Sequence, residues 1–185
     1  MRKIPLVIDT REQRPLDFSA FQDIRFERRK AWPGDYTLQA YSRMLAIERK
    51  SVADLIGTMC GGYAGLTATT PKRFDCELLG LGGIIHLGGR AFVLVEPDGM
   101  GRTAEEQIAA GNYRADISPD KVWRFIDTIR TGWKVPVILA SSREHAAEII
   151  VAAVRSADVE KRSWVPFDKW MESLKITAKK ESVPW

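Results

Sequence analysis

The stretch from Gly34 to Asp54 constrains the fold of this chain more than any other part of its sequence. Residues 36–41 alternate between apolar and polar types, which is typical of a half-buried strand, and 44–47 form a second apolar run. The two residues between these runs can form a turn. We therefore predict two neighbouring antiparallel strands, followed directly by the start of a helix.

Ionisable residues stand where these predicted strands begin and end. Asp35 precedes the first strand, and Glu48, Arg49 and Lys50 end the second. Because paired strands lie about 5 Å apart, Asp35 and Glu48 should emerge together at one end of the sheet, where two carboxylates can hold one hard cation. Glu48 and Lys50 share a strand face, so Lys50 can orient water or stabilise developing charge. This arrangement suits metal-dependent phosphodiester hydrolysis.

The same residues resemble a known family signature. Gly34-Asp35, followed after an interval by the run ERKSVAD at 48–54, resembles the GD…ERKxxxD signature of the ERCC4-type nucleases, which include XPF, Mus81 and Hef. The run 8–12 resembles the earlier acidic motif of that family. Residues 73–78 look like a variant of the family's helix after the signature, and 91–96 like the buried strand that follows it. The resemblance covers roughly residues 4–155.

This resemblance implies a fold and an activity. The fold would be α/β, with a restriction-endonuclease-like core in which helices flank a central mixed β-sheet. The activity would be cleavage of branched, forked or flapped DNA with Mg²⁺ or Mn²⁺, in repair or recombination, and the nuclease domain could form a homodimer. Cellular members usually continue into tandem helix-hairpin-helix repeats, and we expect none in the residues that remain here.

Pattern and resemblance together indicate a set of site residues. Asp9 ends an apolar run and by itself would suggest a polar turn, but acids on neighbouring strands favour it as a third metal ligand that Glu12 supports. Arg11 and Arg49 are expected to hold phosphate oxygens or the carboxylates themselves. The candidate catalytic residues are Asp9, Glu12, Asp35, Glu48 and Lys50; the candidate metal ligands are Asp9, Asp35 and Glu48; the candidate DNA- or phosphate-positioning residues are Arg11, Arg49 and Arg73.

Asp54 is the position where the family signature and helix physics assign different roles. The signature has an acid here, which suggests a metal ligand. Asp54 also lies in the first turn of a helix that Ser51 can cap, where an acid complements the helix dipole. We expect a supporting role, in which Asp54 stabilises the helix and pairs with Arg49 or Lys50.

Hydrophobic periodicity predicts the remaining elements. Strands are expected at 4–9, 23–29, 91–96 and 135–140, and helices at 71–85, 103–110, from Ser118 onward and from Ser142 onward. Glycines within 71–85 allow an alternative in which 84–87 is a hairpin strand, and the family resemblance favours the helix. Residues 57–70 are expected to form a loop beside the site, and the cations at 28–30 a solvated strand end rather than a phosphate contact.

Composition sets broader bounds. A net charge of +4 and a pI near 9.1 permit binding to an anionic polymer without demonstrating it. Two cysteines make neither a disulfide framework nor a zinc pattern, and no apolar run approaches a membrane span, so we expect an intracellular protein that is not inserted in a membrane. We expect a nuclease domain over 1–158 and a basic, tryptophan-containing tail over 159–185.

Two other functions remain open. The family contains partner subunits whose nuclease site has decayed, so the chain could be a DNA-binding partner without activity. It could also be a restriction- or recombination-type endonuclease without a preference for branches. Tail residues could contact DNA, although packing against the domain or a partner is the more ordinary interpretation.

Overall fold

The computed structural model describes residues 3–38, 44–61, 73–111 and 117–160. The elements in chain order are β1 (Ile4–Asp9), β2 (Ile24–Arg29), β3 (Tyr36–Leu38), β4 (Leu45–Ser51), α1 (Val52–Gly61), α2 (Arg73–His86), β5 (Arg90–Glu96), α3 (Ala104–Ala110), α4 (Pro119–Thr131), β6 (Val137–Leu139) and α5 (Arg143–Glu160). The predicted turn at 42–43, most of the predicted loop at 57–70 and the tail from 161 lie outside the described residues.

The strands form one mixed sheet in the order β2-β1-β3-β4-β5-β6. β3 is antiparallel to both β1 and β4, which confirms the predicted antiparallel pair. The pairs β1–β2, β4–β5 and β5–β6 are parallel. At one end of the sheet, β1 ends, β3 begins and β4 approaches its last residues. This arrangement brings Asp9, Asp35 and Glu48 to the same end of the sheet.

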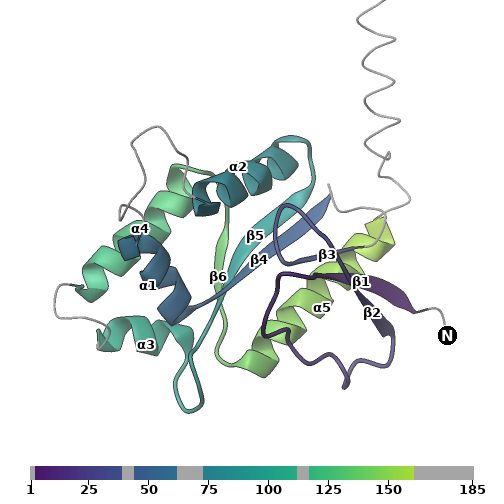
Figure 1. The fold of residues 1–185 in the computed structure, drawn as a ribbon, viewed down its shortest axis with the longest axis horizontal. Helices are drawn as coiled ribbons and strands as arrows, with labels where there is room; N and C mark the ends of the chain where they lie inside the picture. The colour runs from purple at the N-terminus through teal and green to yellow at the C-terminus, as the bar shows by residue number, and fades with distance from the viewer. Residues whose placement is uncertain (1–2, 39–43, 62–72, 112–116, 161–185) are drawn as a thin grey trace, which may run out of the picture.

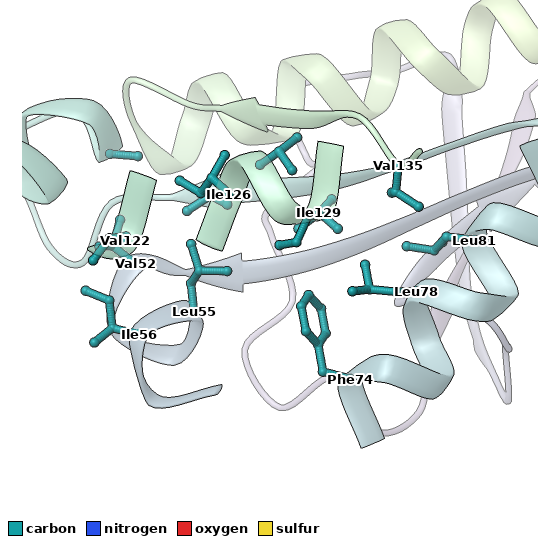
Figure 2. Packing of buried hydrophobic residues seen from close by; sticks show 14 of the residues in the cluster. Val52, Leu55, Ile56, Phe74, Leu78, Leu81, Val122, Ile126, Ile129 and Val135 are labelled. Atoms are coloured by element: carbon teal, nitrogen blue, oxygen red, sulfur yellow. The ribbon is translucent and has the colours of Figure 1, made fainter. Parts of the chain in front are cut away.

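Helices cover both faces of the sheet (Figure 1). On one face, α5 packs Ala146, Ile150 and Val154 against the odd-numbered β4 residues such as Ile47. On the other face, α1, α2 and α4 form a separate core, shown in Figure 2, in which Leu55, Leu78 and Ile126 contribute. The alternation along β4 therefore sends successive side chains into different environments. None of the described helices is long and apolar enough to cross a membrane.

α2 is continuous through its glycines. The predicted helix is therefore confirmed, and the alternative hairpin strand at 84–87 is not formed. Gly80 is required by packing, because a Cβ atom there would lie 2.7 Å from the Cβ of Pro33. Leu78, Leu81 and Ile84 are buried on the core side and compensate for the low helix propensity of the glycines.

α1 extends further than predicted. Residues 57–61 are helical, whereas the loop was expected to begin at Gly57. Met59 and Cys60 pack against the core formed with α2 and α4, and this burial outweighs the helix-weakening effect of Gly57. Tertiary packing decides the end of this helix.

Candidate active site

The ends of β1, β3 and β4 place three acids at one level of the sheet. Ile8 pairs with Tyr36, and Tyr36 pairs with Ile47. One residue further, the amide of Asp9 donates to the carbonyl of Asp35 (2.7 Å), and the amide of Asp35 donates to the carbonyl of Ile47 (2.8 Å). Asp35 and Glu48 thus emerge at the same end of the β3–β4 pair, as the sequence predicts.

A cleft of about 950 Å³ opens at this end of the sheet. The candidate site residues that line it are Arg11, Glu12, Asp35, Glu48, Arg49, Lys50, Asp54 and Arg73. Nζ of Lys50 lies 3.4 Å from Oε1 of Glu48 and 4.5 Å from the ring centroid of Phe74. Glu48 and Lys50 therefore share a strand face, as predicted, and the Phe74 ring of α2 holds the ammonium in place.

The carboxylates of Asp35 and Glu48 lie in surroundings that disfavour their charged forms. Burial raises the pKa of Glu48 to about 8, and the charge of Asp35 adds to this shift. Burial likewise raises the pKa of Asp35 to about 6, although the amide of Arg49 donates a 2.9 Å hydrogen bond to its Oδ2 and opposes the shift. Removal from water and mutual repulsion both disfavour the charged forms. A cation between the two groups would favour the charged forms.

Asp9 does not line the cleft. Its carboxylate is fully buried and accepts hydrogen bonds from the amide of Arg11 (2.6 Å), from Nε of Arg11 (2.9 Å) and from the amide of Ala31 (2.6 Å). Burial alone would raise the pKa of Asp9, but these hydrogen bonds outweigh it and lower that pKa. Within the described ranges, no group of three acidic, histidine or cysteine side chains could hold a metal ion. Asp9 therefore holds the side chain of Arg11 and the backbone of Ala31 in place.

Arg49 lines the cleft, but its guanidinium is bound by acids on the α5 side of β4. Its Nε and Nη2 donate to Glu12 at 3.0 and 2.8 Å, and its Nη1 donates to Oε1 of Glu96. Arg143 of α5 also donates to Oε1 of Glu96, at 2.7 Å. The side chain of Arg49 is only 9% exposed, so of its two expected roles the structure shows the holding of carboxylates. Glu12 thus holds the guanidinium of Arg49 in place.

Glu96 completes this buried network and was not predicted as a site residue. Both arginines bind its Oε1, while its Oε2 is buried without a hydrogen-bond partner in the described part of the chain. Burial raises the pKa of Glu96, and the charges of Arg49 and Arg143 oppose that shift. The signal in the sequence was an acid that ends a continuous apolar strand.

Glu77 is a further cleft residue that was not predicted from the sequence. It lies on α2, is 5% exposed, and its Oε2 accepts a 3.2 Å hydrogen bond from the amide of Gly34. Its Oε1 lies 4.0 Å from Nη1 of Arg11. The charge of Glu77 also contributes to the raised pKa of Glu48. An acid within the apolar stripe of a predicted helix was the available signal.

Asp54 and Arg73 are exposed at the rim of the cleft. Oγ of Ser51 accepts a 3.1 Å hydrogen bond from the amide of Asp54, which confirms Ser51 as the cap of α1. Asp98 reinforces this end, because its Oδ2 accepts a 2.7 Å hydrogen bond from the amide of Ala53. Arg73 begins α2 beside the cleft and exposes its guanidinium to solvent.

The fold and this cleft define an α/β protein with a restriction-endonuclease-like core and an acidic, lysine-containing site at the ends of its inner strands. The family model of the ERCC4 domain matches residues 8–153, and the chain belongs to that family. No curated protein matches the sequence significantly.

Two solved structures share the fold. XPF from Aeropyrum pernix in complex with DNA has a TM-score of 0.57 and 15% identity over 84% of this chain and 66% of that chain. XPF from the same organism, in a second structure, has a TM-score of 0.58 and 15% identity over 83% of this chain and 61% of that chain. The fold is that of the XPF nuclease domain, as predicted, and the chain spans less than two thirds of each XPF chain.

Proposed function

We propose that this protein is a metal-dependent DNA endonuclease that hydrolyses phosphodiester bonds at branched, forked or flapped DNA. The observation that carries the proposal is the Asp35–Glu48 pair with Lys50 beside it in an open cleft. Membership of the ERCC4 family supports nuclease activity, and the DNA complex of the XPF relative supports DNA as the substrate. We also propose an intracellular location, because the substrate is DNA, and homodimerisation through the nuclease domain.

The residues present fit Mg²⁺ or Mn²⁺. Asp35 and Glu48 supply hard oxygen donors. Burial raises the pKa of both, and the charge of Asp35 adds to the shift of Glu48, so a divalent cation would favour their charged forms. Mg²⁺ is commonly held by one or two carboxylates while water and substrate phosphate complete its coordination. A two-carboxylate site on the cleft wall therefore suffices, and Asp9 is not needed as a ligand.

The bound cation would polarise the phosphodiester and lower the pKa of an attacking water. Lys50 would then face the scissile phosphate, because its ammonium is held between Glu48 and the Phe74 ring. Its charge would stabilise the negative charge that develops on the phosphate oxygens as the P–O bond breaks. Arg73 would bind a neighbouring phosphate from its exposed position at the start of α2.

Preference for branched DNA would have to come from shape, because phosphate contacts carry affinity but little discrimination. A second cavity of about 490 Å³ adjoins the cleft and shares Arg14, Arg49, Ser51, Asp54 and Asp98 with it. The combined surface continues past the start of α1 toward Arg143. Such a surface can accommodate a DNA arm beyond the scissile bond.

The test is cleavage of labelled flap, fork, Holliday-junction and linear DNA of matched sequence, with Mg²⁺, Mn²⁺ or EDTA. We expect flap or fork DNA to be cut faster than linear duplex, and EDTA to stop cleavage. Glu48→Gln, purified in the same way, controls for contaminating nuclease, and Glu105→Gln controls for loss of one exposed acid.

The alternatives give different results in this assay. Binding of branched DNA without cleavage under any metal would identify a nuclease-inactive DNA-binding partner subunit. Equal cleavage of linear and branched DNA would identify a restriction- or recombination-type endonuclease. Cleavage that survives both EDTA and Glu48→Gln would show that the site is misassigned.

A further inference from the structure

Trp32 combines an exposed ring with a firmly held backbone. Its side chain is 57% exposed. The amide of Ala31, immediately before it, donates to Asp9 at 2.6 Å, and the carbonyl of Ala31 accepts from Nη2 of Arg11 at 2.9 Å. After it, the amide of Gly34 donates to Glu77 at 3.2 Å. An exposed aromatic side chain is thus carried on a segment fixed from both sides.

The side chain of Trp32 also rests against α2. A Cβ atom at Gly80 would lie 3.2 Å from Cζ2 of Trp32, so the absence of a side chain at Gly80 leaves the space that the indole edge approaches. Leu79, the preceding residue on α2, is 61% exposed. The ring is therefore positioned by packing as well as by its backbone, while more than half of its surface remains accessible.

The groups that fix this segment belong to the candidate active site. Arg11 and Glu77 both line the cleft that contains Asp35 and Glu48. The indole edge approaches Gly80, which lies one helical turn beyond Glu77 on α2, so the ring lies beside that cleft. Cations precede it, since Arg28, Arg29 and Lys30 are exposed at the end of β2.

We infer that Trp32 is a platform on which an unpaired nucleobase of the DNA substrate stacks, at the border of the cleft that holds Asp35, Glu48 and Lys50. The inference rests on the proposed nuclease function and names the residue that would recognise unpaired DNA. Aromatic rings beside basic residues are the usual means of binding single-stranded nucleic acid. Because the ring is already held in place, little ordering cost opposes stacking.

The charges around Trp32 favour a nucleic acid over a protein partner. Charged residues, lysine in particular, are depleted in the cores of protein–protein interfaces. Trp32 instead follows the exposed Arg28, Arg29 and Lys30 along the chain, and Arg11 donates to the carbonyl of the residue before it, so the segment that carries the ring is basic. A nucleic acid matches both features, because its phosphates pair with the basic residues and its flat bases can stack on the Trp32 ring.

The experiment measures binding without cleavage, in the Glu48→Gln background with EDTA, by fluorescence anisotropy. The ligands are a linear duplex and the same duplex with a single-stranded flap that carries 2-aminopurine beside the branch. We expect Trp32→Ala to weaken flap binding about 5- to 100-fold, within the range measured for stacking of one base, and to change duplex binding less than about twofold. The 2-aminopurine quenching should be lost, and Trp32→Phe should restore part of both signals.

Phe26→Ala is the matched control, because Phe26 is an aromatic residue with 55% exposure and its ring lies near Phe18, whose side chain belongs to the α5-side core. Melting temperatures establish that each variant is folded. Trp32→Ala should leave the salt dependence of binding unchanged, since no phosphate contact is removed.

Equal loss of flap and duplex binding, no loss on either, or a changed oligomeric mass of the DNA-free protein would each overturn the inference. The cleavage assay tests the proposed function separately. A protein that stacks bases on Trp32 but cuts no DNA would refute the nuclease proposal alone.

Discussion

Asp35 and Glu48 emerge together at one end of the antiparallel β3–β4 pair, beside the paired residues Tyr36 and Ile47, and the charge of Asp35 contributes to the raised pKa of Glu48. The backbone fixes this relationship from both sides, because the amide of Asp35 binds the carbonyl of Ile47 at 2.8 Å and the carboxylate of Asp35 accepts from the amide of Arg49 at 2.9 Å. Two carboxylates are thus held together by a strand pair despite their repulsion.

Removing either carboxylate should weaken cation binding. We expect Asp35→Asn and Glu48→Gln each to reduce the affinity for Mn²⁺ by about tenfold or more, measured by calorimetry without DNA. Cleavage should fall about 100-fold or more, because metal stabilisation of the transition state amounts to several kcal/mol. DNA binding should change little. Unchanged Mn²⁺ affinity in both variants would place the cation elsewhere.

The metal-free protein should become less stable as the pH rises from about 5 to 8. The pKa of Glu48 is about 8 in the fold against an ordinary 4.5, so the unfolded chain loses this proton first and unfolding is favoured between these values. Glu48→Gln should flatten the dependence and be more stable at pH 8, by at least about 1 kcal/mol. Urea unfolding from pH 5 to 9 measures this. Parallel curves for both proteins would contradict it, and Mg²⁺ should restore stability to the unmodified protein at pH 8.

Arg49 should matter mainly for stability. Arg49→Met leaves Glu12 and Glu96 buried without their shared cation, and breaking a buried ion pair in this way costs about 3–5 kcal/mol. Arg29→Met is the matched control, because the Arg29 side chain is 60% exposed and its 3.3 Å pair with Glu27 should contribute less than about 1 kcal/mol. Urea unfolding of both variants provides the comparison. Equal effects would show that the network is not buried in solution.

Asp54→Asn should leave the metal requirement unchanged. Asp54 lies in the first turn of α1, where an acid contributes about 0.3–1 kcal/mol through the helix dipole. We expect a stability loss within that range and a smaller loss of cleavage than Asp35→Asn causes. Mg²⁺ titrations of the cutting rate distinguish the two roles. If Asp54→Asn raises the Mg²⁺ requirement as much as Asp35→Asn, then Asp54 is a ligand.

Two glycines of α2 should respond in opposite directions to alanine. Gly80→Ala places a Cβ atom 2.7 Å from Pro33 and should destabilise the protein by about 1–3 kcal/mol. A Cβ atom at Gly83 would meet no other atom within 4 Å, so Gly83→Ala should stabilise the helix by about 0.5–1 kcal/mol. Thermal unfolding measures both. Stabilisation by both substitutions would show that α2 does not pack on Pro33 in solution.

Local patterns in the sequence were sufficient to predict that Asp35, Glu48 and Lys50 lie together at one end of the sheet. The period of a strand determines which of its residues share a face, and an antiparallel pair brings its flanking residues together. These relationships involve neighbours along the chain, so spacing alone predicts them. Local pattern also predicted the cap of α1 by Ser51, whereas the family resemblance was needed to favour a continuous α2 over a hairpin.

Tertiary structure decided which partners the other ionisable groups bind. The carboxylate of Asp9 binds the amide of Ala31, and the guanidinium of Arg49 binds Glu96. The carboxylate of Glu77 on α2 binds the amide of Gly34. Each contact joins residues that are distant in sequence, and the choice among possible hydrogen-bond partners depends on how the elements pack. The sequence by itself thus determined the ERCC4 fold through its resemblance to the family signature, and the central acid–lysine cluster through the period of its strands. Only the packing of α2 and α5 on the sheet decided which other charges are buried as supports and that Trp32 stands exposed beside them.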